Sequence, residues 1–157
     1  MNFWHKFVQA VASTRAGAWF IVNVLFRLDG ALLKVSRGRV FLAMGWDMLL
    51  LTTTGAKSGK PRTIPLLYIA DEKNIVLIAS NGGREKFPAW YWNLRAHPHA
   101  VILAKGRSGN YFAHEAKDSE RARLWKKAVG YFAGYALYEK RITTRKIPVM
   151  VLTPKEV

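Results

Sequence analysis

Short apolar runs separated by polar turn residues follow one another along most of the chain from residue 48 onward. Runs of this length, bounded by Gly, Pro, Asn or Asp, predict β-strands. The expected strands are Met48–Thr54, Arg62–Ala70, Ile75–Ala79, Ala100–Ala104, Tyr111–Ala116 and Pro148–Thr153. Polar groups at 71–74 and 105–110 each join two neighbouring runs and predict hairpin connections.

Three segments between these strands carry a helical pattern instead. Pro88–His97 has proline in its first turn and breaks at Pro98, which indicates a short helix. A second helix is expected to be capped by Asp118 or Ser119. Its apolar face comprises Trp125, Ala128, Val129 and Phe132. A further helix is expected after Gly134.

The order of these elements predicts the fold class. Helices come first, followed by strands, a helix, a strand pair, further helices and a last strand, without the regular alternation of a Rossmann fold. This order favours a mainly β protein with flanking helices (α+β), built on an antiparallel barrel of about six strands. The 157 residues suit one domain, with a basic helical segment at 1–46 and the barrel at 47–157.

Residues 1–46 combine large apolar groups with six cations and a single acid, Asp29. One stripe of a first helix comprises Trp4, Phe7, Val8 and Val11. A second helix is expected from Ala18, and its apolar run is far shorter than the roughly 20 residues that span a bilayer. These helices either lie on an anionic membrane or pack on the barrel or a dimer mate. Because no cleavable export signal is recognisable, we expect a cytoplasmic protein, associated under the first interpretation with the inner face of the cell membrane.

The formal net charge of +15 predicts an anionic partner. Nucleic acid, an acidic lipid surface and a phosphorylated or polycarboxylate small molecule all meet that condition. The cations fall in separate clusters without a recognisable nucleic-acid-binding module, so no nucleic-acid partner is expected. The chain has no cysteine, which excludes thiol chemistry, and its four histidines lack metal-ligand spacing, so no metal is expected.

The first segment that can carry chemistry is the glycine-containing turn within residues 52–65. It brings together backbone N–H groups, hydroxyls and the cations Lys57, Lys60 and Arg62, as binding of an anionic group requires. It is not a Walker loop, since GxxxxGK[ST] is absent and a strand follows. The alternative interpretation is a basic hairpin tip.

The second segment, residues 79–95, ends a strand in Ser-Asn-Gly-Gly (80–83), a tight turn at which a flat ligand can approach the backbone. Ser80 is placed to donate a hydrogen bond there. Trp90 and Trp92 add broad apolar surface, and we interpret both as largely packing residues.

The third segment, residues 131–138, carries Tyr135 and Tyr138, whose spacing puts both hydroxyls on one side of a helix. A phenol can hydrogen-bond a carbonyl oxygen that gains charge during reduction. The alternative is a pair of interfacial tyrosines on an amphipathic helix.

Together these segments resemble the deazaflavin (coenzyme F-420)-dependent nitroreductase and quinone reductase family. The matching pieces are LLLTTTGAKSGKPRTIPLLY (49–68), ASNGGREKFPAWYWNLRAHP (79–98), ERARLW (120–125) and GYALYEKRITTRKIPVMVL (134–152). The resemblance implies a split β-barrel similar to that of FMN-binding relatives. It also implies hydride transfer from the reduced deazaflavin to a quinone-like, nitroaromatic or activated alkene acceptor. The basic N-terminal segment would place this reaction at or near the membrane surface.

The resemblance further implies roles for individual residues. The cofactor-binding positions are Lys57, Ser58, Gly59, Lys60, Arg62, Pro65, Asn81, Gly82, Gly83 and Trp90. The catalytic positions are Ser80, Tyr135 and Tyr138. FMN, with one phosphate and no polyglutamate tail, is the less favoured coenzyme, and a homodimer is a candidate assembly.

Three departures from the family pattern keep a second hypothesis open. The chain has Ala56, Asn81 and Phe132 where the family often has Arg, Lys and, in its best-known nitro- and quinone-reducing members, Tyr. The second hypothesis is a non-catalytic member of the same fold that holds a lipid or another hydrophobic ligand at a membrane.

Overall fold

The structure is a computed structural model that describes residues 46–155, together with the isolated positions 14 and 35. The helices and the apolar stripe expected in residues 1–46 therefore lie outside the described residues. Among the residues described, no helix is long and apolar enough to cross a membrane.

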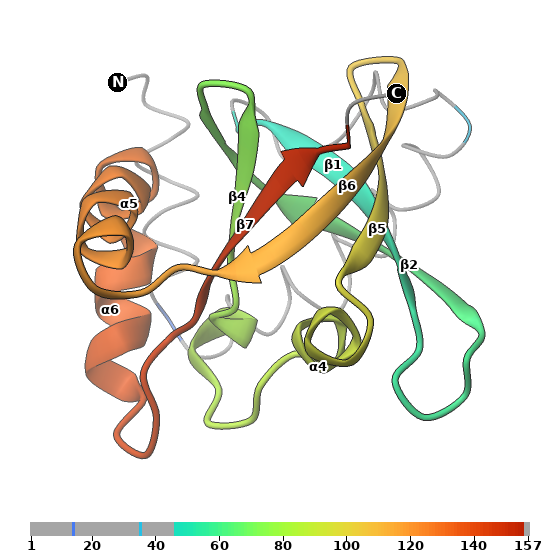
Figure 1. Cartoon of the computed structure of the whole chain (residues 1–157). Helices are drawn as coiled ribbons and strands as arrows, with labels where there is room; N and C mark the ends of the chain where they lie inside the picture. The colour runs from blue at the N-terminus through green and yellow to red at the C-terminus, as the bar shows by residue number, and fades with distance from the viewer. Residues whose placement is uncertain (1–13, 15–34, 36–45, 156–157) are drawn as a thin grey trace.

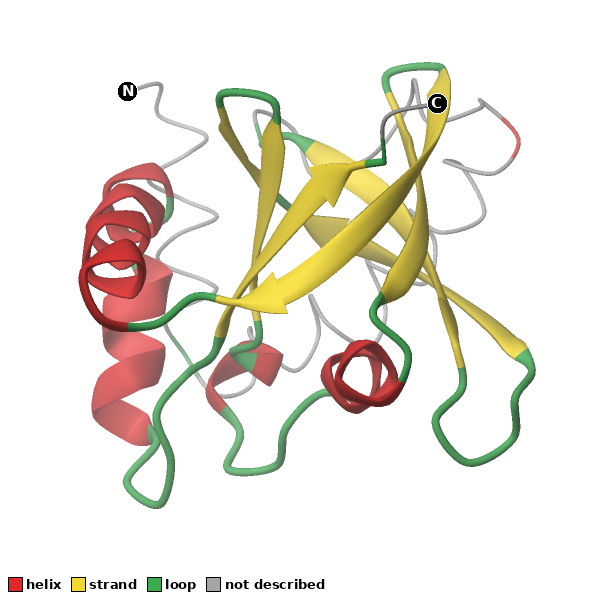
Figure 2. Ribbon diagram, viewed as in Figure 1, coloured by secondary structure: helices red, strands yellow, loops and turns green. Residues whose placement is uncertain are grey.

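Strands dominate the described part of the chain. In chain order its elements are β1 (Met48–Thr54), β2 (Pro61–Leu67), β3 (Ile69–Asp71), β4 (Asn74–Ile78), the 3-10 turn η2 (Asn81–Gly83), α4 (Ala89–Ala96), β5 (His99–Ala104), β6 (Arg107–Glu115), α5 (Asp118–Tyr131), α6 (Gly134–Arg141) and β7 (Val149–Pro154). The strands pair antiparallel in the order β2-β1-β5-β6-β7-β4-β3, and Figure 2 shows the resulting sheet curled on itself. This confirms the expected antiparallel split barrel with flanking helices.

The two edge strands of this sheet are consecutive in sequence. β2 ends at Leu67 and β3 begins at Ile69, so Tyr68 alone separates the two ends of the sheet. The expectation of one strand over Arg62–Ala70 was wrong for this reason. The Tyr68 N–H leaves the strand ladder and donates to the Asp47 carbonyl at 3.1 Å, while the side chain is buried. The barrel consequently has seven strands instead of six.

The two expected hairpins form, although one is tighter than predicted. The β3–β4 turn falls within 71–74, with Glu72 at φ 54. The segment 105–110 is not a loop, because β6 already begins at Arg107. Lys105 and Gly106 have φ of 49 and 78, and two successive residues with positive φ make a two-residue turn that matches the strand twist.

Three of the expected helical segments are present as α4, α5 and α6, but the cap of α5 differs from the prediction. Lys117, with an extended backbone, occupies the N-cap position, and no side chain caps the helix by a hydrogen bond. Asp118 and Ser119 instead begin the helix itself. Asp118 still lies in the first turn, where its negative charge interacts favourably with the positive end of the helix dipole.

The sheet buries side chains on both faces. One cluster fills the barrel, with α4 at its end, and includes Leu49, Leu77, Ile102, Met150, Leu152, Trp90 and Leu94. The other lies between the sheet and the flanking α5 and α6, and includes Val76, Val149, Val151, Ala128, Phe132, Tyr135 and Tyr138. β7 sends alternate residues into the two clusters, which explains its unbroken apolar run.

Candidate functional site

The turn between β1 and β2 (residues 55–60, the cationic turn) projects away from the barrel (Figure 1). Two backbone bonds close it: Gly55 N donates to Lys60 O at 2.9 Å, and Gly59 N donates to Gly55 O at 2.8 Å. Lys57, Ser58, Gly59 and Lys60 are exposed, as is Arg62 at the start of β2.

The root of the cationic turn is tied to α4 by a residue that the sequence did not single out. The buried Asn93 side chain accepts from Ala56 N at 3.0 Å and donates to Thr53 Oγ1 at 3.0 Å. Because Asn93 satisfies the amide and the hydroxyl together, the turn leaves the barrel in a fixed direction.

The cationic turn fits an acidic ligand. Among the described residues, Lys57, Lys60 and Arg62 form no ion pair with a carboxylate. Gly59 has a φ of +65, and a Cβ added to it would meet nothing within 4 Å. An open turn with unpaired cations suits a phosphate or a polycarboxylate tail. Pro65, predicted as a cofactor-binding residue, is buried in β2 opposite Leu50.

The turn that follows β4 (residues 80–83, the Ser80 turn) is tight, as predicted. Asn81, Gly82 and Gly83 have φ of 50, 64 and 78, and Gly83 N donates to Ser80 O at 3.0 Å. Ser80 is buried and the next three residues are half-buried. A Cβ on Gly83 would lie 2.9 Å from the ring of Tyr138, so only glycine allows the turn to approach α6 this closely.

Tyr135 and Tyr138 on α6 face the same side of the helix, as their spacing predicted. Their ring centroids lie 6.4 Å apart, and Phe132 packs against both. Burial raises the pKa of Tyr135, with a further contribution from Tyr138. Burial also raises the pKa of Tyr138, against a smaller opposing effect of Arg141. A tyrosine is neutral at physiological pH even at its ordinary pKa of 10.0, and burial shifts both phenols further from ionisation, so each has a proton to donate.

The sequence comparisons assign the family. The family model described as F420H(2)-dependent quinone reductase matches residues 25–154. The chain belongs to this family. It is 37% identical over 134 residues to F420H(2)-dependent quinone reductase Rv1261c of Mycobacterium tuberculosis (strain ATCC 25618 / H37Rv), a match that covers 82% of this chain and 89% of that protein.

Solved structures agree with this assignment. The structure of F420-H2 Dependent Reductase (FDR-A) is 37% identical, with a TM-score of 0.63, over 68% of this chain and 93% of that one. A chain described as a domain-swapped dimer is 36% identical, with a TM-score of 0.63, over 68% of this chain and 79% of that one.

The family assignment makes the protein an oxidoreductase that uses coenzyme F420, as its resemblance implied. The family expectation is thus confirmed at the level of F420H2-dependent quinone reductases, whereas activity on nitro compounds stays a prediction. The non-catalytic alternative, a lipid-binding member of the fold, is not supported.

The two tryptophans of α4 behave differently in this enzyme. Trp90 is buried inside the barrel, as its interpretation as a packing residue required. Trp92 packs edge-on against Phe87 and Tyr91 but is 49% exposed, so its packing role is only partial. α4 turns Trp90, Tyr91 and Leu94 toward the barrel, and the opposite side of the helix, which carries Trp92, faces solvent.

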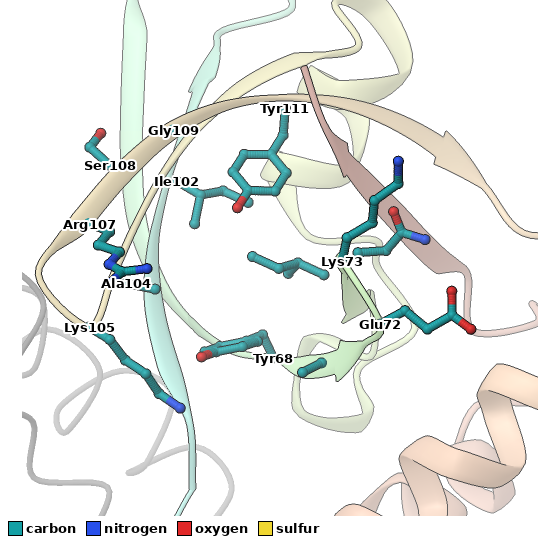
Figure 3. A pocket seen from close by; sticks show the side chains of 13 residues that line it. Tyr68, Glu72, Lys73, Ile102, Ala104, Lys105, Arg107, Ser108, Gly109 and Tyr111 are labelled. Atoms are coloured by element: carbon teal, nitrogen blue, oxygen red, sulfur yellow. The ribbon is translucent and has the colours of Figure 1, made fainter. Parts of the chain in front are cut away.

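A cavity of about 640 Å³ lies at the other end of the barrel, between the β3–β4 and β5–β6 turns (Figure 3). Tyr68 and Tyr111 project into it, and Lys105 and Arg107 lie along one rim. None of the predicted site residues lines this cavity. The cavity is therefore distinct from the cationic turn, the Ser80 turn and α6.

Arg145 is a further residue that the sequence did not place in the site. Its guanidinium donates to backbone carbonyls on both sides of the Ser80 turn, including that of Ser80 at 3.4 Å. No local signal marks this role, because the contact joins segments 65 residues apart.

In the described part of the chain, no group of three or more His, Asp or Glu residues could hold a metal ion.

Proposed function

We propose that this enzyme reduces a quinone-like acceptor with the reduced deazaflavin, and that nitroaromatic and activated alkene compounds are further acceptors. The observation that carries the proposal is the close approach of the Ser80 turn to the ring of Tyr138 on α6. A flat ligand seated on the backbone of Gly82 and Gly83 would lie beside Tyr138. F420 suits this proposal because the exposed cations Lys57, Lys60 and Arg62 would bind its acidic tail.

The coenzyme supplies the hydride when bound. The residues of the chain bind and orient the coenzyme and stabilise the charge that develops on the acceptor. Lys57, Lys60 and Arg62 would hold the phosphate and the acidic tail, with Ser58 and Gly59 offering a hydroxyl and an open backbone. Asn81, Gly82 and Gly83 would border the ring. Pro65 and Trp90 are buried, so we assign them to the packing beneath this surface.

Ser80, Tyr135 and Tyr138 would act on the acceptor. An acceptor carbonyl that receives a hydride gains negative charge on its oxygen, and a neutral hydroxyl stabilises that charge by donating a hydrogen bond. A phenol is protonated at physiological pH even at its ordinary pKa of 10.0, and burial raises the pKa of both tyrosines further, so each carries a proton that it can donate. No residue needs to form a covalent bond with the substrate.

The test is to mix the purified enzyme anaerobically with reduced F420 and menadione and to follow the coenzyme absorbance. The proposal predicts oxidation of the coenzyme that depends on both enzyme and quinone. A nitroaromatic compound and an activated alkene, tested in parallel, rank the acceptors. Absence of coenzyme binding and oxidation would remove the proposal.

We propose a membrane-surface location because the chain has a net charge of +15 and because residues 1–46 combine cations with an apolar stripe at helical spacing. Each cation near an anionic membrane contributes about 1 kcal/mol, so three or four in contact would give binding that weakens with salt. Co-sedimentation with anionic and neutral vesicles, for the full chain and for a version lacking residues 1–17, measures this. Equal binding of the truncated version, or no binding of either, would overturn the location.

A homodimer is proposed as the assembly, because a solved relative is described as a domain-swapped dimer. Sedimentation equilibrium of the full chain at several concentrations measures the state. A monomer at all concentrations would refute it.

A further inference from the structure

Two loops that lie far apart in sequence are bonded to each other beside the proposed site. One is the segment 79–87, which contains the Ser80 turn, and the other is the segment 142–148 between α6 and β7 (the C-terminal loop). Arg145 of the C-terminal loop is inserted into the first segment. Its Nε donates to Glu85 O at 2.7 Å and its Nη2 donates to Arg84 O at 2.8 Å.

The same guanidinium makes four longer hydrogen bonds. They reach the carbonyl oxygens of Ala79 at 3.3 Å, Ser80 at 3.4 Å, Lys86 at 3.4 Å and Lys146 at 3.5 Å. The guanidinium carbon also lies 4.4 Å from the ring centre of Phe87, a cation–π arrangement. The Arg145 side chain thus contacts residues from Ala79 to Phe87, on both sides of the Ser80 turn.

Glu85 makes the reciprocal set of bonds. Its carboxylate accepts from Thr143 N at 3.0 Å, from Thr144 N at 3.4 Å and from both threonine hydroxyls. These hydrogen bonds, that of the Thr144 hydroxyl foremost, lower the pKa of Glu85. Each loop therefore contributes one charged side chain that forms hydrogen bonds with the backbone of the other loop.

This pair of loops connects the two elements proposed to act on substrate. Ser80 and Gly83 lie in the first segment, and Gly83 touches Tyr138 of α6. The C-terminal loop continues directly from α6, where Ile142 N donates to Tyr138 O at 3.1 Å. A shift of either loop would therefore change the position of Ser80 relative to Tyr138.

We infer that Arg145, with Glu85 as its reciprocal partner, is a positioning residue that holds the Ser80 turn against Tyr138. The inference rests on the proposed function for its effect on turnover, whereas its effect on the loops can be measured without coenzyme. The planar guanidinium is required, because its fork of N–H donors reaches several carbonyls at once and a lysine ammonium cannot.

A different explanation would make Arg145 one more cation for the acidic coenzyme. Arg84 provides the matched control, because it lies in the same segment, is exposed and carries the same charge. If charge alone matters, Arg84→Ala and Arg145→Ala weaken coenzyme binding equally and Arg145→Lys restores it. If positioning matters, Arg145→Ala and Arg145→Lys both lower kcat while coenzyme binding changes little, and Arg84→Ala keeps the wild-type kcat.

The first experiment measures amide hydrogen exchange in the coenzyme-free protein. Arg145→Ala and Arg145→Lys should accelerate exchange of residues 80–87 at least tenfold, and Arg84→Ala should leave it unchanged. Glu85→Gln, which keeps an acceptor oxygen, should accelerate exchange of residues 143–146 by a smaller factor. Wild-type exchange in Arg145→Ala would overturn the inference. If Arg145→Ala does not fold, Arg145→Lys and Glu85→Gln decide by the same criterion.

The second experiment measures turnover with reduced F420 and menadione. Arg145→Lys should lower kcat about 10- to 100-fold, as expected from a misplacement near 1 Å, with little change in coenzyme Kd. A kcat equal to that of Arg84→Ala would overturn the inference. An inactive wild-type enzyme would refute the proposed function, while the exchange experiment would still decide whether Arg145 fixes the loop.

Discussion

The cationic turn and the Ser80 turn both follow a strand and both contain glycines, yet the fold treats them differently. Residues 56–60 of the cationic turn are exposed and are anchored at one end through Asn93. The Ser80 turn is packed against Tyr138 and is bonded to the C-terminal loop through Arg145. The first arrangement suits recognition of a flexible anion by charge, and the second suits fixed placement of reacting groups. Binding and turnover should therefore respond to different mutations.

Replacing one glycine in each turn by alanine gives the sharpest separation. Both Gly59 and Gly83 have positive φ, so alanine costs about 1 kcal/mol in backbone strain at either position. At Gly83 the new Cβ also collides with the Tyr138 ring, at 2.9 Å. Gly83→Ala should lower kcat about 100-fold and Gly59→Ala less than threefold, measured with reduced F420 and menadione. Equal losses would show that the approach to Tyr138 has no functional consequence.

The tyrosines should give the next largest effect. Tyr135→Phe and Tyr138→Phe each remove a hydrogen bond that forms mainly in the transition state, so each should lower kcat about tenfold, or about 1.4 kcal/mol. Coenzyme Kd should stay within about twofold of wild type, because the lost hydrogen bond is to the acceptor and does not contribute to binding of the coenzyme. Wild-type turnover in the double variant would reduce both residues to packing.

The cations of the other turn should show the opposite profile. Lys57→Ala and Arg62→Ala should each weaken coenzyme binding about three- to fivefold at low salt, and less at high salt because exposed charges are screened. The kcat at saturating coenzyme should not change. Lys126→Ala, an exposed cation on α5, is the control for total charge. Identical Kd values for all three variants would place the acidic tail elsewhere.

The smallest expected effect concerns stability at alkaline pH. The folded-state pKa of Tyr135 and of Tyr138 lies above the ordinary value of 10.0, because both rings are buried. Above pH 10 the unfolded phenols ionise while the folded ones do not, so the free energy of unfolding should fall as pH rises. The Tyr135→Phe, Tyr138→Phe variant should show a shallower fall between pH 9 and 11 in denaturant titrations. Parallel curves for variant and wild type would contradict the assignment.

Local signals predicted most of the fold correctly. The polar group at 71–74 and the proline before α4 act over a few residues, and the structure shows the turn and the helix where these signals put them. The division of the segment 62–70 at Tyr68 was missed because a tyrosine within an apolar run carries no turn signal. The N-cap of α5 was misplaced because the extended backbone of Lys117 decides it, and sequence alone does not show that conformation.

The candidate site was only partly accessible to the same reasoning. The glycines of the Ser80 turn and the spacing of Tyr135 and Tyr138 are local features, so their geometry was predictable. Asn93 and Arg145 act through contacts with segments 37 and 66 residues away, and neither has a motif of its own. Which cations stay unpaired is likewise decided by tertiary structure.

The position of Tyr68 has a consequence for how the barrel is closed. The sheet order starts with β2 and ends with β3, so its two ends are joined by the covalent chain at a single residue. A circular permutant with its new termini at Tyr68 would keep every hydrogen bond of the strand ladders and would still lose that closure. Its short strand β3, which pairs with β4 alone among the described strands, would be free to separate and pair with the open edge of a second molecule.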